Sequence, residues 1–370
     1  MKRSISIKLC TTEEQTAALA LVQKEFNRAC NLIVPLAVKN RCWNHPDLHR
    51  IAYSTIRAST SLGSQMVCNS IKAVCNSLKV LKIKASQEVP LITFKPYSSV
   101  PFDKRTYSIK DIVLSLYTIS GRITVPMIRA PFNDQYLHKG IPKEATLVYK
   151  NKSWFFNLVL DLPTPPVPKT SGKVMGIDAG ENVLAAMSSG KLFDGKLLRH
   201  KCDCALALRS RLQSNGSKSA KQRLKKISGK EARHIKHVNH TISKALIQEA
   251  LDAGCDTIAL EDLKNIRKQI KAGKRMRLRL HRWPWAQLQA FIVYKAQAAG
   301  LKVVFVNPAY TSKLCATCGN RGIRNKHRFE CKACGILRHS DLNASLNIRR
   351  IAASADTATG TVNYPHMGVA

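Results

Sequence analysis

The sequence predicts a multidomain chain of mixed α+β and α/β architecture, on three observations. Apolar residues recur with a period of two in several segments between residues 89 and 160, as in antiparallel strands. After residue 172, short apolar segments alternate with helical patterns, as in an α/β layer fold. Four cysteines near the C-terminal end have the spacing of a zinc ribbon. At 370 residues, the chain is long enough for two or three domains.

The first domain is expected over residues 1–162 as a small β-barrel with a helical insertion at about 13–85. Residues 3–10 alternate like a strand, and Thr11, Thr12 and two acids then form a helix start. Further strands are predicted at 91–94, 112–116, 122–125, 145–149 and 154–160. Within the insertion, three polar residues lie outside the apolar face of helix 61–81 and are candidate contacts to a nucleic acid, with a solvated face as the alternative: Gln65, Asn69 and Lys72.

The proline-rich segment 162–172 separates this domain from a second one, expected over residues 173–350. Strands are predicted at 173–178, 183–187, 257–260 and 302–306, with helices at 205–251 and 288–299. Helix 205–251 is strongly basic, and so is the run 264–282. Candidate phosphate contacts in these two segments are Lys225, Lys226, Arg275, Arg277 and Arg279. Residues 351–370 are small and polar and are expected to form a flexible tail.

The net charge restricts the class of partner. The chain has 60 Lys and Arg against 23 Asp and Glu, a formal net charge of +37. Self-repulsion on that scale opposes compaction, and a polyanionic partner relieves it, so nucleic acid is the first hypothesis. A ribosomal-type structural protein and a protein of anionic membrane surfaces are the alternatives. No signal peptide and no segment of about 18 apolar residues is present, so we expect a cytoplasmic protein without membrane spans.

The four arranged cysteines are Cys315, Cys318, Cys331 and Cys334, which form the pattern C-x2-C-x12-C-x2-C. Gly319 and Gly335 follow the two pairs and permit the tight turn around a metal. We therefore expect one structural Zn²⁺ in a ribbon at about 311–338. Redox chemistry by two separate Cys-x-x-Cys pairs is the alternative, and the matched spacing argues against it.

Three carboxylates are candidate metal ligands because each ends or follows a short apolar segment in a chain that is poor in acids: Asp178, Glu261 and Asp341. Buried acids in a cationic protein are costly unless a cation satisfies them, and carboxylates are the usual ligands of Mg²⁺. Two such ions support phosphodiester cleavage. Taken one at a time, each acid also fits an ordinary turn residue or helix N-cap.

Together these motifs resemble the TnpB (OrfB) family of bacterial insertion sequences, whose relatives include the compact type V CRISPR effectors. The resemblance covers residues 176–348, and the first 170 residues agree in layout only. It rests on Gly176-Ile-Asp178-Ala-Gly180, on Leu260-Glu261-Asp262-Leu, on both cysteine pairs, and on Asp341-Leu-Asn343-Ala-Ser-Leu-Asn347-Ile. The sequence departs from the family at His339-Ser340, just before the third acid.

The resemblance implies an RNase H-like domain of RuvC type, in which Asp178, Glu261 and Asp341 are catalytic and hold two Mg²⁺. It implies an RNA-guided DNA endonuclease of a transposable element, with the N-terminal barrel as a wedge. A guide RNA derived from the end of the element would select the target, which is double-stranded DNA beside a short motif. The alternatives are an RNA-guided DNA-binding repressor, a compact type V CRISPR effector and a strand-joining transposase on the same fold.

Overall fold

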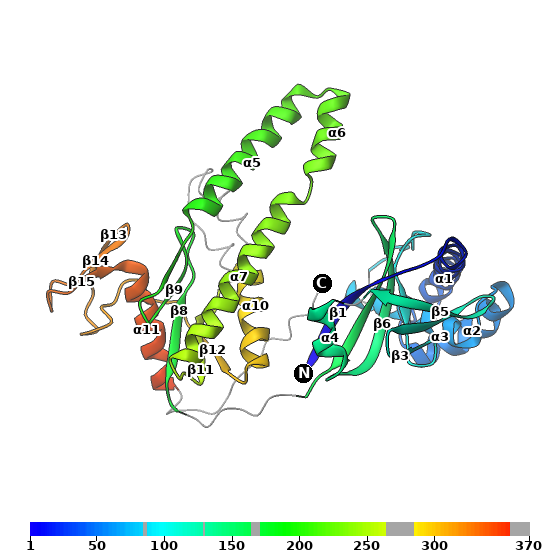
Figure 1. Cartoon of the computed structure of the whole chain (residues 1–370), viewed down its shortest axis with the longest axis horizontal. Helices are drawn as coiled ribbons and strands as arrows, with labels where there is room; N and C mark the ends of the chain where they lie inside the picture. The colour runs from blue at the N-terminus through cyan, green and yellow to red at the C-terminus, as the bar shows by residue number, and fades with distance from the viewer. Residues whose placement is uncertain (84–86, 129, 164–170, 264–284, 356–370) are drawn as a thin grey trace. The chain divides into compact units, whose positions relative to one another are not determined.

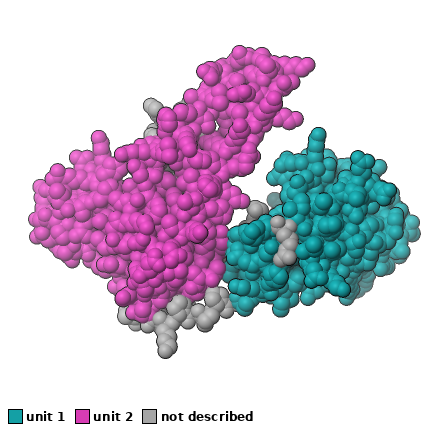
Figure 2. Space-filling model, viewed as in Figure 1, with its two compact units in different colours: residues 1–163 teal, residues 164–370 magenta. Residues whose placement is uncertain are grey.

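The computed structural model describes residues 1–83, 87–128, 130–163, 171–263 and 285–355. They belong to two compact units, residues 1–163 and 164–370 (Figure 2), and the division falls within the proline-rich segment 162–172. Among the helices that the structure describes, none combines the length and apolar character needed to cross a bilayer.

Unit 1 is built on a seven-stranded antiparallel sheet that forms a nearly closed barrel (Figure 1). Its strand order is β2-β6-β7-β1-β5-β4-β3. The two edge strands are neighbours in the sequence, which brings the open edges of the sheet near each other. The strands are β1 (Lys2–Leu9), β2 (Val100–Phe102), β3 (Tyr107–Lys110), β4 (Val113–Thr118), β5 (Gly121–Ile128), β6 (Ile141–Lys150) and β7 (Ser153–Asp161).

The barrel interior is filled by aromatic and aliphatic side chains at every second strand position. Along β7 burial alternates strictly, with Trp154, Phe156 and two leucines facing inward. The Phe156 ring meets the rings of Phe102 and Tyr107 edge-on, with centroids 6.1 and 5.2 Å away. The Tyr107 hydroxyl donates a hydrogen bond of 2.9 Å to the Lys143 carbonyl, which joins edge strand β3 to β6 across the barrel.

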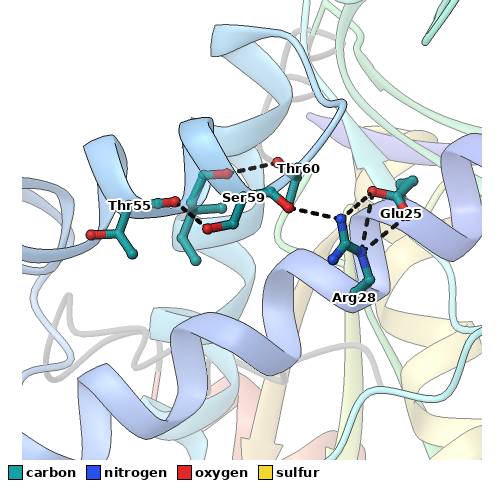
Figure 3. A network of polar contacts seen from close by, with 6 residues as sticks. Glu25, Arg28, Thr55, Ser59 and Thr60 are labelled. Carbon is teal, nitrogen blue, oxygen red and sulfur yellow. Dashed lines mark hydrogen bonds and ion pairs between the residues drawn. The ribbon is translucent and has the colours of Figure 1, made fainter.

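Three helices lie between β1 and β2 in the sequence, where the helical insertion was predicted: α1 (Glu13–Lys39), α2 (His45–Ser59) and α3 (Ser64–Val80). At the start of α1, Thr12 and Gln15 form a reciprocal capping box. At the end of α2, Arg28 of α1 donates a 2.8 Å hydrogen bond to the Ser59 carbonyl while pairing with Glu25 (Figure 3). A short helix, α4 (Pro131–Leu137), follows β5.

The strand predicted at 91–94 is wrong. These residues are extended but pair with no strand of the described chain. Instead, the side chain of Asn31 on α1 accepts from the Phe94 N–H at 2.8 Å and donates to the Phe94 carbonyl at 2.9 Å. Local alternation of apolar residues cannot distinguish a strand from a segment whose backbone is satisfied by a side chain.

Unit 2 is a three-layer arrangement around a five-stranded mixed sheet of order β10-β9-β8-β11-β12 (Figure 1). Its strands are β8 (Val174–Asp178), β9 (Val183–Met187), β10 (Leu192–Asp194), β11 (Thr257–Glu261) and β12 (Lys302–Val306). One face packs on α7 (Lys230–Asp252) and α10 (Trp285–Ala298). The other face packs on α11 (Ser340–Ala355), through Ile348 and Ala352.

A helical arm extends from this sheet, made of α5 (Lys196–Asn215), α6 (Lys218–Ile227) and the first part of α7 (Figure 1). The sequence predicted one helical region over 205–251, and the structure divides it at Gly216 and Gly229, both with positive φ. Along α5 and α6 only Leu198 and Ala220 are buried. The arm therefore presents its many basic side chains to solvent.

The last part of unit 2 is a small three-stranded sheet followed by α11. The strands are β13 (Ile323–Asn325), β14 (Arg328–Glu330) and β15 (Leu337–His339), and β15 leads directly into α11. The flexible tail expected from residue 351 is wrong in its first residues, because α11 continues to Ala355. Ala352 is 1% exposed against the sheet, which holds this last turn in place.

Candidate active site

Two of the three predicted acids lie at the ends of adjacent parallel strands. Asp178 is the last residue of β8 and Glu261 the last of β11. The register pairs Leu260 with Ile177, so the two acids are level at one edge of the sheet. The side chain of Gln289 on α10 donates to the Glu261 carbonyl at 2.8 Å and fixes the end of β11.

The third acid, Asp341, reaches this edge because α11 lies directly on β8. Asp341 is in the first turn of α11 and is 6% exposed. At Gly176, in the middle of β8, a Cβ atom would lie 2.6 Å from the Arg349 nitrogen and closer still to the Ser345 carbonyl oxygen. Only glycine allows the two backbones to approach so closely. Gly176 therefore allows α11, the helix that carries Asp341, to pack directly against β8.

The three acids share one electrostatic environment. Burial and, after it, the negative charges of Glu261 and Asp341 together raise the pKa of Asp178 to about 8, against the opposing effect of Arg324. Burial also raises the pKa of Glu261, while Thr311 and Arg324 lower it. Such a cluster holds negative charge that a bound cation would stabilise. Its donor set is three carboxylates, which is the oxygen chemistry that Mg²⁺ prefers.

Two further residues contact these acids, and sequence reasoning missed both roles. Arg324, on β13, donates to Oδ1 of Asp341 at 2.8 Å. The hydroxyl of Thr311, 3% exposed, donates to Oε1 of Glu261 at 2.5 Å. Thr311 begins the segment expected to form the zinc ribbon, but no spacing rule assigns it a role. Arg324 is one of 60 basic residues, and no pattern in the sequence distinguishes it.

The four predicted zinc ligands lie together in the structure. Their Sγ atoms are all within 4.8 Å of one another, with Cys315 and Cys334 at 3.6 Å and Cys318 and Cys331 at 3.5 Å. A tetrahedral Zn²⁺ with bonds of about 2.3 Å requires sulfur atoms about 3.8 Å apart. Burial raises the pKa of Cys315, but backbone N–H groups and neighbouring thiols lower it to about 6 overall. The Ile336 N–H lowers the pKa of Cys334, whereas burial and the neighbouring thiols raise that pKa to about 12 overall. The thiols of the cluster therefore share their protons, as closely spaced sulfur atoms do without a metal. The cluster therefore fits a structural zinc.

Two buried asparagines of α11 hydrogen-bond to the zinc-site segment, which comprises residues 311–338. Asn343 donates to the Leu314 carbonyl at 2.7 Å and accepts from the Ala316 N–H at 3.0 Å. Asn347 donates to the carbonyls of Thr311 and Leu314 at 2.8 and 2.7 Å. Because the same helix carries Asp341, the first cysteine pair and the third acid are held as one body.

The predicted nucleic-acid contacts are distributed unevenly. Asn69 is 7% exposed, and Gln65 bonds to Asp103 and Arg105 at the turn between β2 and β3. Lys72 is exposed and pairs with Glu144 at 2.9 Å. Lys225 and Lys226 are exposed on α6. The predicted contacts at positions 275, 277 and 279 lie outside the described residues. The roles of all these residues stay predictions.

Comparison with protein-family models finds two matches. The model described as the Cas12f1-like TNB domain matches residues 285–348, and the OrfB model described as a probable transposase matches residues 157–267. The first match covers the cysteine cluster, Thr311, Arg324 and Asp341. The second covers Asp178 and Glu261. Between them the two models therefore cover every residue of the acid cluster.

Curated relatives carry compatible names. The chain is 34% identical over 218 residues to the CRISPR-associated endodeoxyribonuclease Cas12f1 of Sulfoacidibacillus thermotolerans, covering 54% of this chain and 50% of the relative. It is 42% identical over 137 residues to a TnpB-like protein of Methanocaldococcus jannaschii, covering 36% and 49%. It is 26% identical over 231 residues to the putative RNA-guided DNA endonuclease InsQ of Escherichia coli, covering 56% of each. The chain thus spans about half the length of the curated relatives it matches.

Solved structures share the fold at low sequence identity. Cas12f1 in its complex with guide RNA and target DNA superposes with a TM-score of 0.61 at 16% identity, over 91% of this chain and 83% of that one. The mini-RNA-guided endonuclease CRISPR-CasΦ3 gives a TM-score of 0.60 at 10% identity, over 95% and 92%. These matches show that the chain has the mixed α+β fold of those effectors.

Proposed function

Since the chain resembles the TnpB (OrfB) family and is related to the compact type V effectors, we propose that it is an RNA-guided DNA endonuclease of a transposable element. The proposal is supported above all by the convergence of Asp178, Glu261 and Asp341 at one edge of the sheet, where burial and the two neighbouring carboxylates raise the pKa of Asp178 to about 8. Residues 173–350 would then be an RNase H-like nuclease domain of RuvC type, and residues 1–162 a wedge with a helical recognition insertion.

The three carboxylates are proposed to hold two Mg²⁺, with Asp178 between the other two acids. Bound Mg²⁺ supplies charge stabilisation for the attacking and leaving oxygens of a phosphodiester. The protein contributes the geometry. The strand ends fix Asp178 and Glu261, the first turn of α11 fixes Asp341, and Thr311 orients the Glu261 carboxylate through its hydroxyl.

Arg324 is proposed to act on the phosphate in the same site. In the structure it pairs with Asp341 at 2.8 Å, and its guanidinium side chain is 42% exposed. The guanidinium thus lies beside the three carboxylates, where its planar donors match a phosphate group. Cations held by the same carboxylates would satisfy the negative charge that Arg324 satisfies in the structure, which would leave the guanidinium available to a phosphate.

The partners of the proposed activity are a guide RNA and double-stranded target DNA. Base pairing to the guide selects the sequence, and a protein surface reads a short motif beside the target. The exposed basic arm of α5 and α6, with Lys225 and Lys226, is proposed as a wall of the nucleic-acid channel. The zinc bound by the four cysteines is structural in this scheme, because four protein ligands leave no open position.

The test begins with purification of the protein from cells that carry its gene with the native flanking sequence, followed by sequencing of the bound RNA. The complex is then incubated with Mg²⁺ and a plasmid library randomised beside a guide-matched site. We expect a discrete RNA and cleavage next to one short motif, both requiring the guide match. The Asp178→Asn variant should keep the RNA and lose cleavage, while Asp203→Asn, an exposed acid on α5, should keep both.

Three outcomes would contradict the proposal in different ways. Tight binding of a guide-matched target without cutting by the unaltered protein would indicate an RNA-guided repressor. The absence of any discrete RNA would reject guided cleavage and favour a transposase. Cleavage that persists in Asp178→Asn would place the chemistry elsewhere.

A further inference from the structure

A second charged site lies at the other end of β8 from the three acids. A pocket of about 690 Å³ is bordered by the first residues of β8, the residues just after β9, the last turns of α11 and the first cysteine pair. The part of its lining next to and within β8 runs from Gly172 to Met175, whereas Asp178 ends the same strand. Met175 is three positions from Asp178, which is about 10 Å along a strand at about 3.3 Å per residue. The pocket and the acid cluster are therefore distinct.

The pocket is cationic throughout. Its charged lining residues are Lys173, Arg338, Arg349 and Arg350, and no Asp or Glu belongs to the lining. Two acids adjoin lining residues in the sequence, Asp252 and Asp256. Asp256 is 5% exposed and accepts from the Gly172 N–H and the Thr257 hydroxyl, each at 2.7 Å, and Asp252 accepts from the Gln248 amide at 2.8 Å. Both carboxylates thus have hydrogen-bond partners within the protein, and the lining itself combines four cations with no carboxylate.

The fold directs these cations to one place. Arg338 donates to the Thr317 hydroxyl at 2.8 Å, which holds its guanidinium against the first cysteine pair. A Cβ atom at Gly319 would lie 3.5 Å from Nη1 of Arg350, so that side chain extends toward the same turn. Lys173 and Arg349 both act on the thiol of Cys255, lowering a pKa that burial and Asp256 raise. Four basic residues from three segments, the start of β8, strand β15 and helix α11, thus line one cavity.

The chemistry of the lining specifies the ligand. Arginine guanidinium groups bind phosphate through paired donors, and the hydroxyls of Ser189 and Thr317 add further donors. The lining contains no aromatic side chain on which a nucleobase could stack. Arg349 and Arg350 are exposed, as contacts to an extended strand require. These features fit the sugar-phosphate backbone of a nucleic acid and carry no means of reading its sequence.

We propose that this pocket binds the backbone phosphates of a nucleic-acid strand that is held there and not cut. The distance to the acid cluster keeps those phosphates away from the proposed metal ligands. The proposal adds a second nucleic-acid site to the proposed nuclease, and binding without Mg²⁺ tests it independently of cleavage. Failure of cleavage would therefore leave this site standing, and loss of this site would leave the acid cluster intact.

The first experiment measures affinity for a fluorescent single-stranded oligouridine as a function of salt, using zinc-loaded full-length protein freed of copurified nucleic acid. In Arg349→Gln/Arg350→Gln, the slope of log K against log salt should fall by about 1.4, the value for two lost phosphate contacts to a single strand. Affinity at moderate salt should fall about tenfold. The control Lys244→Gln/Lys332→Gln removes two exposed charges that lie outside both the pocket and the arm, one in the second half of α7 and one between the second pair of cysteines. An equal loss in the control would show diffuse attraction and overturn the proposal.

The second experiment uses Cys255 as a reporter in the unaltered protein. Cys255 lines the pocket and is partly exposed, whereas Cys10 is exposed in unit 1. Alkylation by a maleimide, followed by peptide mass spectrometry, gives the rate at each thiol. Oligouridine should slow alkylation of Cys255 several-fold more than that of Cys10. Unchanged Cys255 alkylation would reject the site, and equal protection by inorganic phosphate alone would show a pocket for a free anion instead of a strand.

Discussion

The two ends of β8 carry opposite charge and suit opposite tasks. At its C-terminal end Asp178 meets Glu261 and Asp341, and at its N-terminal end Lys173 meets Arg338, Arg349 and Arg350. One helix serves both ends, because α11 places Asp341 in its first turn and the two arginines about two and a half turns later. The helix dipole favours an acid at that first turn. One strand and one helix, β8 and α11, thus hold a candidate metal site and a candidate phosphate site apart from each other.

The largest effect should come from Gly176→Val, which disrupts the packing of α11 on β8. Both ends of β8 depend on this packing. The added side chain would collide with the backbone at Ser345 and Arg349, so α11 must move off β8. Overpacking against backbone should cost about 3 kcal/mol or more in the free energy of unfolding of unit 2. Denaturant titration measures it, and both cleavage and oligouridine binding should fall together.

The matched control for this variant is Gly190→Ala. Gly190 has a φ of +100° and no atom within 4 Å of an added Cβ, so only backbone strain of about 1 kcal/mol is expected. If Gly176→Val lowered the free energy of unfolding no more than this control, the packing of α11 on β8 would not depend on the absence of a side chain at position 176. Loss of cleavage with full binding would show that the two ends are not coupled through α11.

Removal of zinc should affect both ends, with a smaller effect on folding. The zinc-site segment contributes Arg324 to the acid end and Thr317 and Arg338 to the basic end. We expect Cys331→Ser to lose its zinc by elemental analysis and to lower cleavage about tenfold to a hundredfold. Oligouridine affinity should fall as well, while Cys204→Ser, an exposed cysteine on α5, should change neither. A zinc-free protein with unchanged cleavage and oligouridine binding would show that neither site depends on the zinc ribbon.

Asp178→Asn should stabilise the metal-free protein, in a manner that depends on pH. Asp178 ionises near pH 3.8 in the unfolded chain and at about 8 in the folded one. A raised pKa contributes stability below the lower value, and that stability is lost as pH rises toward the upper one. The variant does not titrate, so its advantage over wild type should grow from pH 5 to pH 8, to on the order of 2 kcal/mol.

Thermal unfolding at the two pH values, with and without Mg²⁺, measures this difference. Mg²⁺ should raise the stability of the wild type at pH 8 and have little effect on the variant, because the variant lacks one of the proposed ligands. An advantage of Asp178→Asn that is equal at both pH values would show that ionisation is not its cause. The basic end offers the contrast, since Arg349→Gln should show no such dependence on pH.

Sequence motifs and spacing predicted some residues of this site. The other residues are brought to it by contacts between segments that are distant in the sequence. The cysteine spacing and the segments around Asp178, Glu261 and Asp341 identified residues that the fold places near one another, and their catalytic role stays a prediction. The pairing of Arg324 with Asp341 could not be read from sequence, because it joins one arginine among many to an acid on another element. The basic pocket was missed for the same reason.

The fold shows a similar division. Period-two and helical patterns predicted β1, β4 to β9, β11, β12 and the helices α1 to α3 of unit 1, but not the short helix α4. They failed at 91–94, where Asn31 satisfies the backbone of an apparent strand, and they missed the short strands β2 and β3 that complete the barrel. A strand of three or four residues has too few positions to show a period, and its pairing partner lies elsewhere in the chain.

The smallest expected effect concerns Thr311→Val, which alters the acid end alone. Losing the hydroxyl that donates to Glu261 should raise the pKa of that carboxyl further, since Thr311 lowers it. One such hydrogen bond is worth about 1 kcal/mol, so the Mg²⁺ concentration for half-maximal cleavage should rise about fivefold near neutral pH. The deficit should shrink as pH rises, because Glu261 then ionises without help. Thr311→Ser keeps the donor and should behave as wild type. A deficit that does not vary with pH would assign Thr311 a packing role, and weakened oligouridine binding would mean that the two ends of β8 are not independent.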